Sequence, residues 1–380
     1  MLNKILKFIQ ENLLVLIILV IGAGLFNVKF FGGYKFTPLI CLWAALIMIY
    51  PSLVPLSFDK IKEVKKYWRI LLLSATLNFI LAPTVAYFIG WLFLNEQPAL
   101  RLGIILLALL PGGGMVTMWA LKSKANMLTT VGIVLLNLLL AIVIVPFGLS
   151  YAMNQLQIDT TNSVKESTPD KSLKNINAVP LNSSADLITL NNAEPAESCV
   201  IEKASQGIAS CDFGGEGVTP MKIAIPIVFI ILLPLILAFI TQKLLLRKKS
   251  TEDAFKIKKR FGAFSNLGLL IVLFMLMSLE DNIVIFDSAI LIWDIFIALL
   301  FFYGIIFSVS WFIYKKFYFN AQGKALLWGS YLRYITLALG FAISLVYQDK
   351  SLEPIILIIV LSYLIQIPSS YLISNLLRKH

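Results

Sequence analysis

The chain has little charge and very few residues of the kinds that carry catalysis. Only 14% of its 380 residues are charged, and it contains one histidine and three cysteines. The histidine is the C-terminal His380, and the apolar segments contain neither a carboxylate pair nor a serine–histidine arrangement. We therefore expect no enzyme, no metal site and no cofactor. The first apolar stretch also lacks a small-residue cleavage site, so we expect no cleavable signal peptide.

Long apolar runs dominate what is present. Hydrophobic residues make up 59% of the chain, far more than in an ordinary soluble domain. Each run has about the length that a helix needs to cross roughly 30 Å of hydrocarbon, which is too long for the strands of a barrel. We therefore predict an all-α polytopic membrane protein with ten transmembrane helices, at residues 12–28, 36–56, 70–94, 102–121, 126–152, 223–242, 262–279, 288–314, 325–347 and 354–376.

The charges between these spans predict how the chain is oriented. With both termini in the cytoplasm, about two thirds of the 32 Lys and Arg residues fall in cytoplasmic segments, but only about a quarter of the 21 acidic residues do. An excess of Lys and Arg marks the cytoplasmic side. We therefore expect an integral protein of a plasma membrane or bacterial inner membrane. The net charge of +11 then reflects topology in a lipid bilayer and indicates no nucleic-acid partner.

A polar segment at residues 153–221 divides the spans into two groups of five. We expect it to be a flexible extracytoplasmic loop inserted between a first repeat, residues 1–152, and a second repeat, residues 222–380. Cys199 and Cys211 both lie in it, and an oxidising compartment favours a disulfide between them, the alternative being two free thiols. An odd number of crossings before the loop makes the second half enter from the opposite side, as in an inverted repeat.

The fourth span contains the sharpest local signal. Pro111 cannot donate a backbone hydrogen bond, and Gly112, Gly113 and Gly114 follow it directly. We expect these residues to break the helix near mid-membrane, so that free N–H groups of the next half-helix point toward the centre. Broken helices of this kind bind ions and anionic groups in secondary transporters, and Thr117 lies one turn further on. The alternative is a kinked helix in tight contact with a neighbour.

The ninth span contains a buried charge. Arg333 is the ninth residue of this span counted from its inner end, and a charge at that depth costs about 2.5–3.5 kcal/mol. Such a residue faces a cavity or a partner, so we expect a functional role, with a structural ion pair to Asp294 as the alternative. Other polar residues within spans include Asn78, Asn137 and Gln366. Each is typical of hydrogen bonding between helices, and Asn78 is the best candidate among them for a ligand contact.

Four groups of residues form recognisable motifs within the predicted spans. They are Met48-Ile-Tyr-Pro-Ser-Leu53 with Phe58-Asp59, Leu77-Asn78-Phe79 with Pro83, Pro111-Gly112-Gly113-Gly114, and Met115-Val116 with Trp119. These motifs resemble those of the superfamily of bile acid:sodium symporters and arsenite permeases. The resemblance implies ten spans in two inverted repeats. Spans one, two, six and seven would form a panel, and the others a core in which the broken spans four and nine cross.

The chain also departs from both branches of that superfamily. Gly112 stands where the arsenite permeases, as the resemblance implies, carry a cysteine, and residues 332–335 stand where they carry Asn-Asn-Phe-Glu. The resemblance to the sodium symporters likewise implies a Glu and a Gln in the ninth span. Arg333 brings a positive charge to that level instead, which does not suit sodium ligation.

From these features we expect a secondary active transporter that moves a small organic anion by alternating access. Whether Na⁺ or H⁺ would be the coupling ion stays open. One alternative is an arsenite or metalloid efflux permease, and another is a membrane sensor or scaffold without transport activity. The expected substrate-binding residues are Gly112, Gly113, Gly114, Thr117, Arg333 and Asn78.

Overall fold

The computed structural model describes residues 8, 12–33, 43, 49–54, 64–166, 220–246, 251–278, 289–348 and 354–379. Within these ranges the chain is helical, and its β-structure is one isolated bridge. Cys199 and Cys211 lie outside the described residues, as do Phe58-Asp59 and most of the predicted loop. The α-helices are α2 (Leu13–Phe31), α5 (Trp68–Thr76), α6 (Ala82–Phe93), α7 (Pro98–Leu109), α8 (Gly114–Lys122), α9 (Met127–Glu166), α10 (Pro220–Thr241), α11 (Thr251–Met277), α13 (Ala289–Phe317), α14 (Ala321–Tyr331), α15 (Ile335–Gln348) and α16 (Pro354–Lys379).

Four stretches of helix in the described part of the chain are long and apolar enough to cross a membrane. They are Trp68–Phe93, Met127–Leu156, Leu291–Phe317 and Pro354–Arg378. Shorter apolar helices lie at Val15–Phe31, Pro98–Leu109, Ile231–Leu244 and Phe264–Met275. The predicted helical membrane protein is therefore confirmed at this coarser level. The finer prediction of ten spans in two inverted repeats stays a prediction.

The third predicted span is one helix with a π-helical turn inside it. The turn, η2 (Leu77–Leu81), joins α5 to α6 just before Pro83. Because proline has no N–H and its ring crowds the preceding turn, an α-helical ladder cannot pass through it unchanged. The wider π turn accommodates this local misfit, and π turns of this kind are frequent at functional sites.

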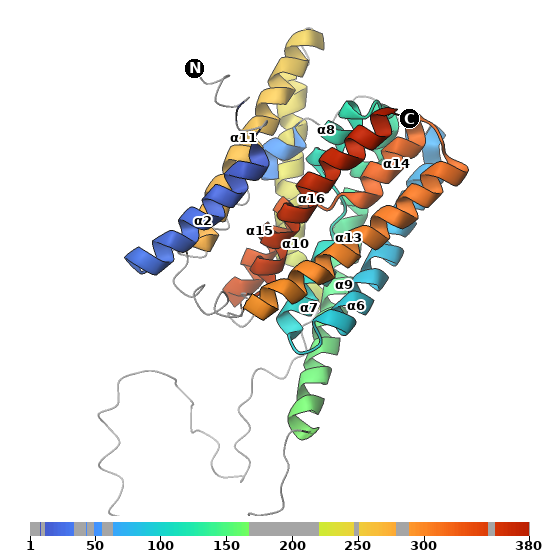
Figure 1. Cartoon of the computed structure of the whole chain (residues 1–380). Helices are drawn as coiled ribbons and strands as arrows, with labels where there is room; N and C mark the ends of the chain where they lie inside the picture. The colour runs from blue at the N-terminus through green and yellow to red at the C-terminus, as the bar shows by residue number, and fades with distance from the viewer. Residues whose placement is uncertain are drawn as a thin grey trace, which may run out of the picture.

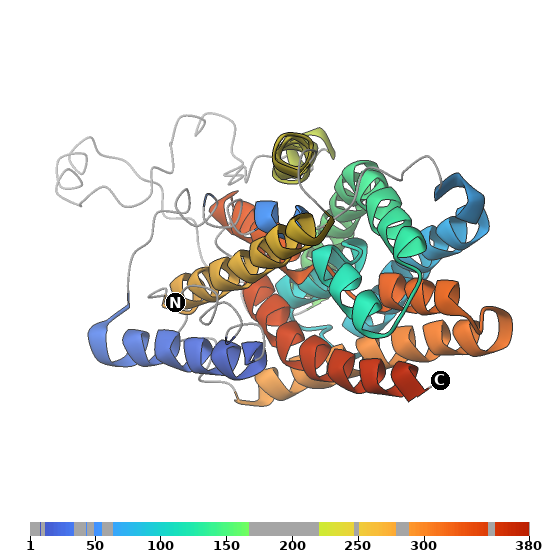
Figure 2. The same cartoon turned by 90° about the horizontal axis from the view of Figure 1, so that it is seen from above.

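The helices pack around a centre formed by α7 and α14. Helix α7 packs against α6, α9 and α16, while α14 packs against α5, α9 and α13. Figures 1 and 2 show α2 and α11 side by side at one edge of the molecule. The short helical segment at residues 49–54 contacts the end of α10, because Tyr50 Oη lies 2.7 Å from Thr241 Oγ1.

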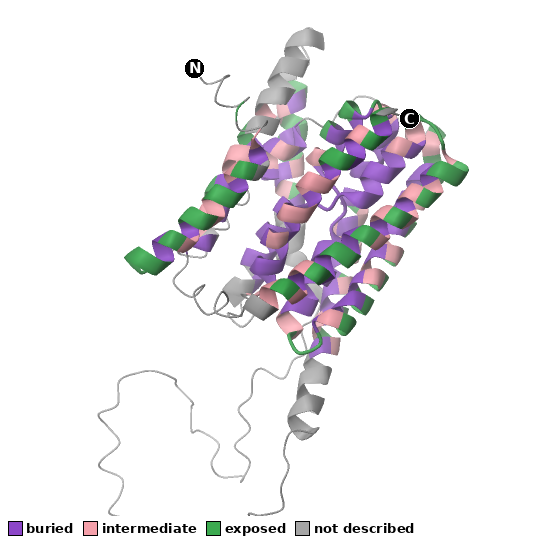
Figure 3. Ribbon diagram, viewed as in Figure 1, coloured by how far each residue is buried: buried purple, intermediate pink, exposed green. Residues whose placement is uncertain are grey.

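Burial separates this centre from the outer helices (Figure 3). Every residue of α7 from Leu100 to Leu109 is buried. The outward faces of α6 and α13 instead expose large apolar side chains, among them Phe88, Trp91 and Leu300. Apolar surface of this kind on outer helices is the surface that lipid tails cover.

The fifth predicted span is longer than expected. Helix α9 begins at Met127 and continues to Glu166, which lies beyond the predicted loop boundary at residue 153. Figure 1 shows this end of α9 projecting past the other helices. Polar residues follow the apolar stretch here, and the helix continues into them. The division of the chain at a loop inserted at residues 153–221 stays a prediction.

Lys324, at the start of α14, links this helix to the C-terminal ends of α8 and α16. Lys324 Nζ donates to the carbonyl of Ser123, which caps α8, at 3.4 Å and to that of Leu377 in α16 at 2.8 Å. Carbonyls at helix C-termini carry the negative end of the helix dipole and favour a cation. Burial lowers the pKa of Lys324, and the charge of Lys124 lowers it further.

Candidate functional site

The predicted break in the fourth span is present. Helix α7 ends at Leu109, Leu110 is extended with φ −103° and ψ 97°, and α8 begins at Gly114. Pro111 and the glycines between the helices are buried. The sequence therefore located this break to within a residue or two, because proline and three glycines weaken a helix wherever they stand.

The ninth span is broken as well. Helix α14 ends at Tyr331, Leu332 is extended with φ −74° and ψ 137°, and α15 begins at Ile335. No proline or glycine lies between the two half-helices. Local propensity therefore gives no cause for this break, and its cause lies in the contacts that the extended segment makes.

The two breaks lie side by side and pair with each other. Pro111 and Arg333 form an antiparallel β-bridge, and Tyr334 N donates to Leu110 O at 3.2 Å. In a membrane interior each unpaired backbone group costs several kcal/mol, so irregular backbone survives only where protein satisfies it. Each break therefore supplies backbone partners that the other needs.

Gln366 of α16 supplies a second set of partners. Its Oε1 accepts from Arg333 N at 2.8 Å, and its Nε2 donates to Arg333 O at 3.2 Å. Tyr303 Oη also donates to Gln366 Oε1, at 3.0 Å. The side-chain amide thus binds the backbone of the ninth-span break as a neighbouring strand would. The expectation that Gln366 bonds between helices is confirmed.

The three glycines allow close approach, and each is covered by a different neighbour. A Cβ at Gly113 would overlap the ring of Tyr334, and a Cβ at Gly114 would overlap the backbone carbonyl of Ser52. At Gly112 the overlap would be with Val116 and with Leu332 of the other break. The glycine segment is therefore filled by the protein's own residues in this conformation.

Ser52 and Tyr334 close the N-terminal end of α8. The Ser52 hydroxyl is hydrogen-bonded to the Tyr334 hydroxyl, and both residues cover the glycine segment. Thr117 lies on the first turn of α8 and donates its hydroxyl to Gly114 O at 2.7 Å. The sequence pattern gave no reason to pair Ser52 with Tyr334, because the two residues are 282 positions apart.

Arg333 is buried with 2% of its surface exposed. Its Nη1 donates to Ala108 O at 3.1 Å, its Nη2 donates to Ser330 O, and its guanidinium lies 5.8 Å from the centre of the Phe302 ring. Its Nε has no hydrogen-bond partner among the described residues. Arg333 thus joins the crossing point through its backbone, while its side chain turns toward the C-terminal ends of α7 and α14.

The alternative of a structural ion pair is not observed. No salt bridge joins Arg333 to Asp294 in the described part of the chain, and the recorded partners of the guanidinium are carbonyl oxygens and an aromatic ring. A neighbouring carboxylate is the usual partner of a buried charge in a membrane. Arg333 is therefore a buried cation held by dipoles and a ring.

Asn78 belongs to a buried polar cluster that links three elements. Its Nδ2 donates to Gly329 O of α14 at 3.0 Å and to Ser74 Oγ at 3.3 Å. Asn137 of α9 donates to the same Ser74 Oγ at 2.9 Å. The Oδ1 atoms of both asparagines have no partner among the described residues. The cluster therefore ties the third and fifth spans to α14 next to its C-terminal end.

We expect Asn78→Leu to weaken the fold, because it removes the bond to Gly329. Polar bonds between membrane helices contribute about 0.6 kcal/mol on average and up to about 1.7 kcal/mol. Equilibrium unfolding in mixed micelles measures the change. Thr76→Val is the matched control, since Thr76 Oγ1 bonds only to Leu72 O within its own helix. An equal loss in both variants would contradict a tie between helices.

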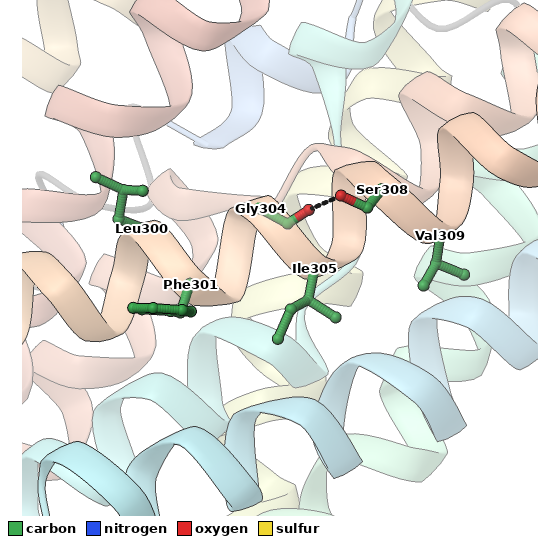
Figure 4. Close-up of a pocket in the computed structure, with 6 residues that line it drawn as sticks. All are labelled: Leu300, Phe301, Gly304, Ile305, Ser308 and Val309. Carbon is green, nitrogen blue, oxygen red and sulfur yellow. Dashed lines mark hydrogen bonds between the residues drawn. The ribbon is translucent and has the colours of Figure 1, made fainter.

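A surface groove on α13 is a separate feature. Its volume is about 300 Å³, and Figure 4 shows Leu300, Phe301, Gly304, Ile305, Ser308 and Val309 along it. Its one side-chain polar group, the Ser308 hydroxyl, donates to Gly304 O at 2.7 Å. The groove therefore presents apolar surface from a single helix and no group suited to recognising a charged substrate.

Two comparisons with known proteins found similarities. Residues 42–181, which begin within the second predicted span and extend past the fifth, match the family described as the Sodium Bile acid symporter family. The chain is also 33% identical over 92 residues to the "Arsenical-resistance protein Acr3" of Corynebacterium glutamicum. That alignment spans 24% of this chain and 25% of the Corynebacterium protein.

Proposed function

We propose that the chain is a secondary transporter of a small organic anion, from the superfamily of bile acid:sodium symporters and arsenite permeases. The match of residues 42–181 to the Sodium Bile acid symporter family and the similarity to the Corynebacterium protein support this proposal. In this proposal the protein has ten spans in two inverted repeats, with both termini in the cytoplasm. The panel contains the helix at residues 49–54 together with α2, α10 and α11. Alternating access consists of movement of this panel against the core that holds the two breaks.

The observation that carries the proposal is the pairing of two broken spans around a buried cation. Paired breaks place free ends of four half-helices at one point, and a transporter of this architecture binds its substrate there. The glycine segment and Thr117 lie at the N-terminal end of α8, which carries the positive end of a helix dipole and attracts an anion.

The contact between Ser52 and Gly114 supports the proposed movement. Ser52 belongs to the panel and Gly114 to the core, and they touch where substrate would bind. Substrate entry then requires this contact to open. In this proposal the conformation described is a closed one, because Ser52 and Tyr334 cover the glycine segment.

Arsenite efflux is the second candidate, because the Corynebacterium relative is named for arsenical resistance. A soft thiolate suits a metalloid, and Gly112 stands where the resemblance puts a cysteine. Cys41 is the one cysteine within a predicted span, and it lies outside the described residues. The chemistry of the described centre favours an organic anion.

Transport by the purified protein in liposomes tests this proposal. We expect saturable uptake of at least one compound from a set of labelled mono- and dicarboxylates, and no uptake of arsenite. Gly113→Val should abolish uptake, because the added side chain would occupy the space of the Tyr334 ring. Gly22→Val should retain it, because a Cβ at Gly22 meets no atom within 4 Å. Uptake of arsenite alone would establish the second candidate instead, and uptake of neither would favour a sensor or scaffold.

A further inference from the structure

The two carbonyls that hold Arg333 occupy equivalent places in two half-helices. Ala108 is the residue before the last of α7, and Ser330 is the residue before the last of α14. The last four carbonyls of a helix have no partner within it and together carry about half a negative charge. Two helix C-terminal ends therefore converge on one guanidinium in the middle of the protein.

Such a pair of ends is where a transporter of this architecture binds a coupling cation. Half-helix C-terminal ends and unwound carbonyls coordinate Na⁺ or H⁺ in discontinuous membrane helices. In this chain Ala108 O and Ser330 O already accept from Arg333 Nη1 and Nη2. The face of the Phe302 ring, which is fully buried, lies against the same group and adds a cation–π contact.

Na⁺ does not fit this arrangement. Na⁺ is a hard cation that needs several oxygen ligands, and the two carbonyls nearest the guanidinium are engaged by its donors. A second cation beside a buried guanidinium would also be repelled strongly, because the low-dielectric surroundings screen charge poorly. The guanidinium cannot lose its charge to relieve this repulsion, since arginine stays protonated in proteins.

We propose that Arg333 is a tethered cation that takes the place of the coupling Na⁺, so that this transporter works without sodium. The inference rests on the proposed function and deepens it. A tethered charge balances the charge of a bound organic anion but cannot dissociate with it into the cytoplasm. A sodium gradient therefore does no work on the substrate, which moves down its own gradient, in exchange for a second anion or together with protons.

Thermal unfolding of the full-length protein in detergent tests the proposal without a substrate. The melting temperature of the natural protein should be the same in sodium chloride and in choline chloride at equal concentration. Arg333→Ala should melt at a lower temperature, and millimolar guanidinium chloride should restore part of the loss saturably, because free guanidinium can enter the space left by the side chain. Choline chloride at the same concentration should restore nothing.

Arg101→Ala is the matched control. Arg101 is also a buried arginine, with 4% of its surface exposed, but its Nη1 bonds to the side chain of Asn95 outside the crossing point. Guanidinium should not rescue this variant. If Arg333→Ala does not fold, Arg333→Lys keeps the charge and should fold with a melting temperature that sodium does not change.

Three results would overturn the proposal. The first is saturable stabilisation of the natural protein by sodium but not by choline. The second is an Arg333→Ala variant that guanidinium rescues no better than it rescues Arg101→Ala. The third is a sodium-dependent melting temperature in Arg333→Lys. Failure of the proposed function would give a different result. The melting temperatures would then be as expected, but no organic anion would enter the liposomes.

Discussion

Gly114→Ala is expected to open the centre of the protein without unfolding it. The new Cβ would overlap the carbonyl of Ser52, and a backbone atom cannot move aside as a flexible side chain can. The smallest movement that removes this overlap shifts the segment at residues 49–54 away from α8. This movement also breaks the hydrogen bond between Ser52 and Tyr334. The variant should therefore populate a conformation in which Thr117 is accessible to water.

Labelling of a cysteine at position 117 measures this opening. In a background where the three natural cysteines are replaced by serine, Thr117→Cys should react slowly with a membrane-impermeant maleimide, because position 117 is buried with 7% of its surface exposed. Adding Gly114→Ala should raise the reaction rate about tenfold or more, which corresponds to a population shift of about 1.4 kcal/mol.

Gly304→Ala is the control for that experiment. A Cβ at Gly304 meets no atom within 4 Å, so this substitution should leave the labelling rate unchanged. Replacing a mid-helix glycine by alanine even favours the helix by about 0.5–1 kcal/mol. An unchanged rate in Gly114→Ala, with the protein folded, would show that the contact with Ser52 does not hold the centre closed.

Trp328→Ala should produce a large loss of stability, about 3–5 kcal/mol, which is typical of removing a buried Trp or Phe. Trp328 is fully buried in α14, and its ring lies 5.8 Å from that of Trp119 in α8. Its Nε1 donates to Ser123 Oγ at 2.7 Å. The substitution therefore leaves a cavity and removes both the stacking and the bond that hold α14 to α8.

The same substitution at Trp293 provides the comparison. Trp293 exposes 64% of its surface on α13, where lipid would cover it, and its ring contacts that of Phe296. Substitutions of exposed residues change the free energy of unfolding by about 0.5 kcal/mol. Trp293→Ala should therefore unfold at nearly the same denaturant concentration as the natural protein. Equal losses at the two positions would contradict the assignment of α14 to the core.

The break in the fourth span was predictable from the sequence, and that in the ninth was less so. Pro111 and the glycines after it weaken a helix in any surroundings, so the break could be located from residue type alone. Leu332, Arg333 and Tyr334 have no such tendency. They are extended because Leu110 O and the Gln366 amide offer partners to their backbone.

The site residues show the same division between local and long-range information. The burial of Arg333 followed from its depth in an apolar run, but the carbonyls that it binds belong to the backbone and leave no mark in composition. Asn78 was expected to contact a ligand, and the structure shows its Nδ2 donating to Gly329 O. The predicted role of Asn78 in substrate binding stays a prediction, as does the disulfide between Cys199 and Cys211.

Because Gln366 bonds to the N–H and the carbonyl of residue 333, it holds this position by atoms that every amino acid except proline possesses. The side chain at 333 can therefore change in evolution while the crossing of the two broken spans is kept. A neutral or acidic residue there would alter the charge at the two helix ends. If Arg333 replaces a coupling cation, as proposed, such a substitution would change the ion dependence of transport and leave these two backbone bonds in place.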